Sequence, residues 1–390
     1  MAFIKFLLPA LAITGLAAAA SGDCDSKTIQ NQGDADALAS CKTISGNLEI
    51  SPKASGTISI SGVERITGKF TCKGAENMTE LSASKLASIE DTFMLSGLTT
   101  LATLKFDALS QVNSINFEAL PRLQQLSFSK GVTKADRVRI TNTDLVNLNG
   151  IDLETVGDMD ISNNPHLTEV NVNKITNATG YVSFSANHVE LKIKFPNLAN
   201  ALNMTFRNAS VVSLPSLKQT AGLLGFYSNF FQDFSAPNLT STGDLVFNDN
   251  SQLGNISLPA LQTVKGAFQI ANNTNLKAVT EVPKLQTITG ALDFTGNFSQ
   301  VDLSGLKEVR GQFNMQSSGK LDCGPFDKDV KPNVRGKYTC RGGVDDPQSS
   351  DPSRTGGNKP NKSGLAGPGA VPPSGMTILA LLGIVVRFAL

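Results

Sequence analysis

Residues 258–270 read LPALQTVKGAFQI, in which apolar residues spaced three apart are followed by a glycine and an apolar-x-apolar ending. The ending recurs thirteen times. Its second apolar residue returns every 20 to 24 residues, at Ile50, Cys72, Leu95, Phe117, Ile140, Ile161, Phe184, Phe206, Phe226, Phe247, Ile270, Phe294 and Met315. The first lies two positions earlier, at Leu48, Phe70, Phe93, Ile115, Val138, Met159, Val182, Met204, Leu224, Leu245, Phe268, Leu292 and Phe313. A period of this length is typical of leucine-rich repeats and related solenoids.

The segments between the endings are too short and too rich in proline for long helices. They carry apolar residues three apart, as in Leu98, Leu101 and Leu104. Proline, which disfavours a helix interior, lies inside or beside several of them, at Pro121, Pro196, Pro215, Pro237, Pro259 and Pro283. We therefore predict an all-β fold, a single right-handed parallel β-solenoid of about 13 coils of roughly 22 residues, over residues 46–316.

Asparagine is frequent three residues after the ending, at Asn164, Asn187, Asn229, Asn250, Asn273 and Asn297. A stacked asparagine can bond the backbone of its own turn and of the next coil, which satisfies polar groups that the corner buries. We expect a buried ladder of these side chains. Asn297 would then be a poor glycan site, whereas Asn272, one position away from the ladder, would be better exposed.

The open ends of a solenoid expose an edge strand and an apolar cross-section, so residues 21–45 and 317–341 are expected to form caps. Each cap holds two cysteines seventeen residues apart, Cys24 and Cys41 in the first and Cys323 and Cys340 in the second. In an oxidising compartment we predict one disulfide within each cap. Cys72 takes an inward repeat position, which favours a buried free thiol, and a pairing with Cys41 is the alternative.

Both termini carry targeting features. Residues 1–20 have Lys5, an apolar run and a small-residue end, the layout of a secretory signal peptide. Residues 376–390 form an apolar tail that contains Arg387, preceded by small residues and a Pro/Gly/Ser-rich stretch. This predicts a glycosylphosphatidylinositol (GPI) signal, with a stalk over 342–364, attachment at Gly364 and a propeptide over 365–390. Asn361 and Gly367 are alternative attachment residues, and a single membrane span is the alternative for the tail.

The chain holds nine N-x-S/T sequons, which together with the signal peptide indicate passage through a glycosylating secretory route. Setting Asn297 aside, we expect glycosylation at Asn77, Asn177, Asn203, Asn208, Asn238, Asn255, Asn272 and Asn361. The net charge is +1 with acids and bases interspersed, which argues against a nucleic-acid partner.

The residue between the two apolar positions of each ending faces outward and builds a surface row. Arg137 and Arg139 lie in one coil and Asp158 and Asp160 in the next, so we expect cross-strand ion pairs. Paired carboxylates could also act as in a glycoside hydrolase. A general acid, however, needs a raised pKa, and adjacent arginine lowers it.

No cofactor or metal motif is present in the sequence. His166 and His188 fall in turns and belong to no metal-ligand spacing, so we expect exposed turn residues. The chain has no tryptophan and three tyrosines, and Tyr181 and Tyr227 point outward by register. These two are the first candidates for ligand contact.

The repeat LPxLQxVxGxFxI, the cap cysteines Cys24 and Cys41, the stretch VERITGKFTCKGAENMTEL and the anchor signal together resemble one known family. The chain is similar to fungal GPI-anchored cell-wall organisation proteins, whose ectodomain resembles the receptor L-domains of growth-factor receptors. The resemblance implies a non-enzymatic surface glycoprotein of the plasma membrane and cell wall that contributes to wall integrity, without cofactors.

Its expected partners are wall polysaccharide or wall proteins and, through the lipid, the outer leaflet of the plasma membrane. A receptor-like module that binds one protein or glycan is the alternative. A wall-polysaccharide enzyme is the third and least favoured hypothesis.

Overall fold

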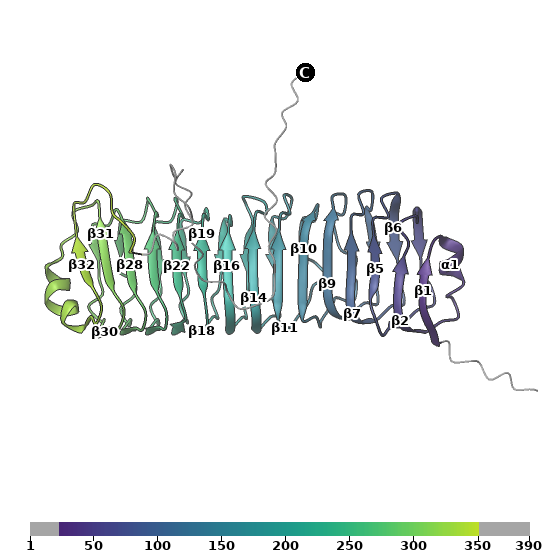
Figure 1. The fold of residues 1–390 in the computed structure, drawn as a ribbon, viewed down its shortest axis with the longest axis horizontal. Coiled ribbons are helices and arrows are strands. Elements are labelled where there is room, and N and C mark those ends of the chain that lie inside the picture. Colours follow the sequence, from purple (N-terminus) through teal and green to yellow (C-terminus); the bar gives the residue numbers. More distant parts are fainter. Residues whose placement is uncertain (1–22, 351–390) are drawn as a thin grey trace, which may run out of the picture. The chain divides into compact units, whose positions relative to one another are not determined.

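A computed structural model describes residues 23–350 of the chain, and the predicted signal peptide, anchor signal and Gly364 lie outside this range. The described part is a parallel β-solenoid whose coils stack in chain order along one axis (Figure 1). One 22-stranded sheet runs along it. Its principal strands are β1 (Asp23–Ile29), β2 (Thr43–Ile50), β5 (Phe70–Lys73), β7 (Ser88–Ser96), β9 (Gln111–Leu120), β10 (Arg137–Thr143), β12 (Asp158–Ser162), β14 (Asn177–Ser185), β16 (Asn200–Arg207), β19 (Leu224–Tyr227), β22 (Leu245–Asn248), β25 (Phe268–Ala271), β28 (Leu292–Gly296), β31 (Phe313–Ser317) and β32 (Tyr338–Arg341).

Shorter strands complete each coil. Those in the same sheet are β4 (Arg65–Ile66), β11 (Thr155–Val156), β18 (Gln219–Thr220), β21 (Ser241–Thr242), β24 (Thr263–Val264), β27 (Thr287–Ile288) and β30 (Glu308–Val309). Small parallel sheets along another side contain β3 (Gly56–Ser59), β6 (Met78–Ser82), β8 (Thr103–Lys105), β13 (Glu169–Asn171), β15 (Lys192–Lys194), β17 (Val211–Ser213), β20 (Asp233–Ser235), β23 (Asn255–Ser257), β26 (Ala278–Val279) and β29 (Gln300–Val301).

The register of the principal strands follows the repeat. Leu245 pairs with Phe268, and Phe268 pairs with Leu292, so the first apolar positions of successive endings lie side by side. The two apolar positions of all thirteen endings are buried, each at most 1% exposed. The structure therefore confirms the predicted solenoid, and it adds a strand in each cap: β1 pairs with β2, and β32 pairs with β31.

Phenylalanine rings fill the middle of the stack. The rings of Phe184, Phe206, Phe226 and Phe247 lie one above another in consecutive coils, with centroid separations of 6.0, 5.5 and 4.8 Å and near-parallel planes. Phe234 contacts two of them from the opposite wall of the coil, at 4.3 Å from Phe226 and 5.5 Å from Phe247. Each of these four rings thus contacts a ring of an adjacent coil, and Phe226 also contacts Phe234 of its own coil.

The asparagine ladder is present in two runs, Asn164–Asn187 and Asn229–Asn250–Asn273, and all five side chains are buried. Asn250 Nδ2 donates to the carbonyl oxygen of Phe226 at 3.1 Å and to Asn273 Oδ1 at 3.0 Å. Asn250 Oδ1 in turn accepts from the backbone N–H of Asn229 at 3.0 Å. Because a buried amide without partners costs about 1–3 kcal/mol, these bonds hold the corner in one arrangement.

The prediction for Asn297 was wrong, because this residue is exposed and lies outside the ladder. The residue before each ladder asparagine has a left-handed backbone, as at Asp249 (φ 60°) and Asn272 (φ 58°). Gly296 has no positive φ, since β28 continues through it, and Phe298 rather than Asn297 is buried after this corner. Asn272 is exposed as expected.

Both predicted disulfides are present, Cys24–Cys41 and Cys323–Cys340, each with a Cα–Cα distance of 5.9 Å. The first cap contains the helix α1 (Gln32–Asp36), and the second contains the π-helical turn η1 (Phe326–Val330) and the 3-10 turn η2 (Lys331–Asn333). The caps lie at opposite ends of the stack (Figure 1). Each cap covers the coil at its end of the stack, and its disulfide links the cap strand covalently to the rest of the cap.

Cys72 is a free, fully buried cysteine, so the alternative pairing with Cys41 was wrong. Burial raises the pKa of its thiol to about 12. We expect no reaction of Cys72 with a maleimide at pH 8 in the folded protein and complete reaction in denaturant, because only the thiolate is nucleophilic. Mass spectrometry of the labelled chain measures this.

A Ser251→Cys variant gives the matched control, since Ser251 lies exposed in a turn. Its added thiol should react within minutes in the native state while Cys72 stays unmodified. Rapid labelling of both thiols in the folded protein would contradict the buried assignment.

Candidate binding surfaces

The outer face of the 22-stranded sheet, called the sheet face below, carries the predicted ion pairs. Arg137 pairs with Asp158 (Nε–Oδ2 3.5 Å) and Arg139 with Asp160 (Nε–Oδ2 3.8 Å), as their strands β10 and β12 lie in register. Arg139 also bonds Glu118 of β9 at 3.3 Å, a partner that the sequence interpretation missed. All these side chains are substantially exposed, so each pair contributes at most about 1 kcal/mol.

Arg139 lowers the pKa of Asp160 as expected, but a larger opposing effect is also present. Partial burial of the Asp160 carboxyl raises its pKa, and the opposing effects of the Arg139 charge and the Ser162 hydrogen bond do not cancel this rise. Local desolvation on the sheet face therefore outweighs the neighbouring charge. A position in the repeat gives the neighbours of a residue but not its solvent exposure.

The two candidate tyrosines both lie on the sheet face but not together. Tyr181 lies in β14 and is 44% exposed. Tyr227 is the last residue of β19, two coils further along. Tyr227 is half-buried, and the Arg207 guanidinium lies 4.2 Å from its ring centroid. Tyr181 is consequently the open aromatic surface of the pair, while Tyr227 is already packed by its neighbours.

Within residues 342–350, which the sequence assigns to the stalk, residues 348–350 contact the C-terminal part of the sheet face. Asn314 Nδ2 donates to the carbonyl oxygen of Gln348 at 2.9 Å, and the backbone N–H of Ser350 donates to Asp293 Oδ2 at 3.2 Å. Gln316 both donates to and accepts from the Gln348 backbone. Nothing in the local sequence of this Pro/Ser segment indicates the contact, because it depends on which side chains the distant strands present.

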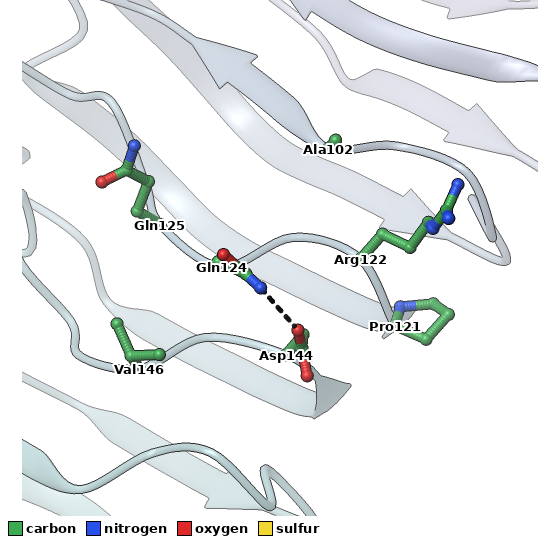
Figure 2. A pocket seen from close by; sticks show the side chains of 7 residues that line it. All are labelled: Ala102, Pro121, Arg122, Gln124, Gln125, Asp144 and Val146. Atoms are coloured by element: carbon green, nitrogen blue, oxygen red, sulfur yellow. Dashed lines mark hydrogen bonds between the residues drawn. The ribbon is translucent and has the colours of Figure 1, made fainter.

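A hollow of about 530 Å³ lies at the corner after β9 (Figure 2). Its lining includes Arg122, Gln124 and Asp144, and Gln124 Nε2 donates to Asp144 Oδ2 at 3.3 Å. The ring of His166 bonds Asp144 Oδ1. His166 is exposed as predicted, whereas His188 is half-buried and its Nδ1 accepts from the backbone N–H of Glu190.

This hollow offers hydrogen-bonding groups, and its lining contains no Ser, Thr, Cys or Lys. Over residues 23–350, no three His, Cys, Asp or Glu side chains come together as metal ligands. In the same range no helix combines the length and the apolar character that crossing a membrane requires.

The sequons within the described range differ in the environment of their amides. Asn77 and Asn272 are exposed. Asn238 Nδ2, the atom to which a glycan would be attached, donates to the carbonyl oxygen of Pro215 at 2.8 Å. Asn203 is half-buried beside Tyr181, and its Oδ1 accepts from the backbone N–H of Leu223. Glycosylation at each predicted site stays a prediction, and Asn361 lies outside the described residues.

A parallel solenoid with capped ends and polar outer surfaces places the chain in the class of repeat proteins, whose stacked coils present a long surface. Comparison with known proteins identifies the family. The model of the Ecm33 family, described as GPI-anchored cell wall organization protein, matches residues 1–39.

Relatives extend this match over the whole chain. A "Cell surface GPI-anchored protein" of Arthroderma benhamiae is 49% identical over 98% of both chains. "Protein ecm33" of Aspergillus fumigatus is 48% identical over 90% of this chain and 89% of its own. "Cell wall protein ecm33" of Schizosaccharomyces pombe is 30% identical over 88% and 82%. No solved structure matches the chain.

The chain belongs to the Ecm33 family of GPI-anchored cell wall organisation proteins. It is therefore a protein of the extracellular face of the plasma membrane and of the cell wall. The resemblance inferred from the repeat and the cap cysteines is confirmed.

Proposed function

We propose that this chain is a non-enzymatic, GPI-anchored glycoprotein that contributes to fungal cell-wall organisation by binding wall polysaccharide or wall proteins along its surface. The observation that carries the proposal is the continuous parallel sheet, closed at both ends by disulfide-linked caps. Such a stack keeps its outward side chains in fixed rows about 4.8 Å apart. Attachment of the lipid at Gly364 would hold these rows outside the membrane.

The ion pairs support a structural rather than a catalytic role for the paired carboxylates. Asp158 and Asp160 each lie against an arginine of β10. A hydrolase would need one protonated and one free carboxylate facing a shared substrate. The raised pKa of Asp160 alone does not supply this arrangement, because Arg139 lies between Asp160 and Glu118 and bonds both.

Complementation of a deletion strain tests the proposal. Loss of the gene should raise sensitivity to a wall-binding dye, and the full chain should restore resistance. The double variant Asp158→Asn and Asp160→Asn should restore it equally well, because a scaffold does not require these carboxylates. Failure of that variant, at normal surface abundance, would support the enzyme hypothesis instead.

A receptor-like binding module is the second candidate, favoured by the exposed ring of Tyr181. In the same strain, Tyr181→Ala should leave dye resistance unchanged if the chain acts as an extended scaffold. Tyr227→Ala is the matched control, since its ring is already packed against Arg207. Loss of resistance with Tyr181→Ala alone would favour recognition of one defined ligand at this position.

The proposed anchor is tested on intact cells. Release by a phosphatidylinositol-specific phospholipase would report the lipid-anchored fraction, and release by glucanase would report the wall-linked fraction. Retention after both treatments would contradict attachment through Gly364.

A further inference from the structure

A groove of about 720 Å³ runs across consecutive coils at the corner where β4, β7, β9, β11 and β14 begin or end. Its lining includes Ser88, Gln111, Lys134 and Thr155 at equivalent positions of successive coils, and Asn113 two positions after Gln111. Ser88 pairs with Gln111, and Gln111 with Lys134, so the groove runs parallel to the solenoid axis and perpendicular to the strands. It is separate from the hollow beside Asp144.

The sequence explains why the surface is hollow here. Most coils place three residues in the bend between the short strand and the principal strand, as between Ile89 and Phe93. Three consecutive coils place only two residues there, between Val112 and Ile115, Ala135 and Val138, and Val156 and Met159.

The next bend again has three residues, from Thr179 to Tyr181. The three short bends form a trough, and the longer bends at Glu90 and Thr179 also line the groove. The shape of the groove therefore follows from the lengths of successive bends.

The backbone beneath the groove is bonded within the protein, whereas polar side chains of the lining face solvent. Val112, Ala135 and Val156 are at most 5% exposed. The backbone beside them is bonded from coil to coil, as from the N–H of Asp136 to the carbonyl oxygen of Asn113 at 2.9 Å and from the N–H of Gly157 to that of Asp136 at 2.9 Å.

Among the described residues, the lining side chains of Ser88, Gln111, Asn113, Lys134 and Thr155 make no hydrogen bond or ion pair with the protein. Hydroxyl, amide and ammonium groups along the groove are thus open to a ligand. These are the groups with which proteins bond the hydroxyls of a sugar chain.

The charge of the lining selects among extended ligands. Arg65 and Glu90 form an ion pair, and Asp136 lies 4.0 Å from Arg137, while Lys134 is the remaining charged lining residue. The lining holds two cationic and two anionic residues and so has no net charge. A polyanion or a basic peptide would gain no overall attraction, whereas a neutral chain of hydroxyls would meet donors and acceptors along its length.

We propose that this groove binds a short stretch of a neutral, linear polysaccharide laid along the solenoid axis. From the coil of Ser88 to that of Asn177 the groove spans four coil spacings, about 19 Å, which suits several sugar units rather than a single one. Tyr181 follows the lining residue Thr179 by two positions and offers an exposed ring beside that end of the groove. The inference deepens the proposed wall-binding function and rests on it for the class of ligand.

The test titrates defined hexasaccharides into the full chain purified in detergent. The probes are a β-1,3-linked glucose hexamer and a β-1,4-linked N-acetylglucosamine hexamer, with a uronic acid hexamer as the charged comparison. All proteins carry Asn177→Gln, because a glycan on Asn177 would cover the end of the groove. We expect saturable binding of at least one neutral hexamer by calorimetry and none of the uronic acid hexamer.

The double variant Gln111→Ala and Thr155→Ala should weaken this binding at least tenfold. Its matched control is Thr263→Ala with Thr287→Ala, which removes two side chains at the same position of the repeat outside the groove. Circular dichroism should show the same melting temperature for both. Equal binding by the two double variants, tighter binding of the charged hexamer, or no binding of either neutral hexamer would overturn the proposal.

The complementation assay distinguishes failure of the groove from failure of the proposed function. A groove variant that restores full dye resistance would reject the groove and keep the wall function. A deletion strain without any wall defect would reject the proposed function itself.

Discussion

Phe226→Ala should lower the free energy of unfolding by about 3–5 kcal/mol, the largest loss we expect from a single side chain in the stack. Phe226 is fully buried, and its ring contacts Phe206, Phe247 and Phe234 at centroid distances of 4.3 to 5.5 Å. Removal of the ring leaves a cavity between coils whose backbones are held at the strand spacing by hydrogen bonds. The cavity therefore cannot close by local collapse, which keeps the cost near the upper end of the range.

Chemical denaturation followed by circular dichroism measures this loss. Phe226→Leu is the matched variant, because it retains most of the volume and should cost about 1.5 kcal/mol or less. In a solenoid each coil contacts only its neighbours, so a weakened central coil also reduces the coupling between the two halves. We expect the unfolding transition of Phe226→Ala to broaden. A loss below 1 kcal/mol with an unchanged slope would contradict the close packing of this ring.

The repeat alone predicted the features that depend on one coil and its direct neighbours. The inward register, the buried thiol of Cys72 and the ion pairs of Arg137 and Arg139 all follow from a period that brings equivalent residues side by side. The ladder at Asn250 follows for the same reason. These contacts join positions about one repeat apart, so the spacing in the sequence determines them.

Features that depend on bend geometry or on distant segments were missed. Asn297 leaves the ladder because β28 continues through Gly296, a difference of backbone conformation that the residue pattern does not carry. The contact of Gln348 with Asn314 joins the stalk to a strand that precedes it by more than thirty residues. The groove depends on three short bends in succession, a signal that was present in the sequence as a residue count between apolar positions.

The second large effect on stability is expected at the glycine of the repeat, because glycines of successive coils stack directly on one another. Gly266, Gly290 and Gly311 stand in one column in successive coils, and the N–H of Gly290 donates to the carbonyl oxygen of Gly266 at 3.0 Å. A Cβ added at Gly290 would lie 2.5 Å from that oxygen and 2.6 Å from the carbonyl carbon, closer than Cβ atoms approach other heavy atoms in proteins. Gly290 has no positive φ, so the conflict is one of space alone.

Gly290→Ala should therefore destabilise the fold by about 3 kcal/mol, the upper part of the range for overpacking, since the conflicting atoms belong to backbone and cannot rotate away. Gly254→Ala is the matched control, because its Cβ would find the nearest atom at 3.7 Å and its φ is also ordinary. That change should alter stability by less than about 0.5 kcal/mol. Equal stability of the two variants would mean that adjacent coils can move apart at the glycine column without a cost in free energy. The glycine in LPALQTVKGAFQI would then not be required by the close approach of adjacent coils.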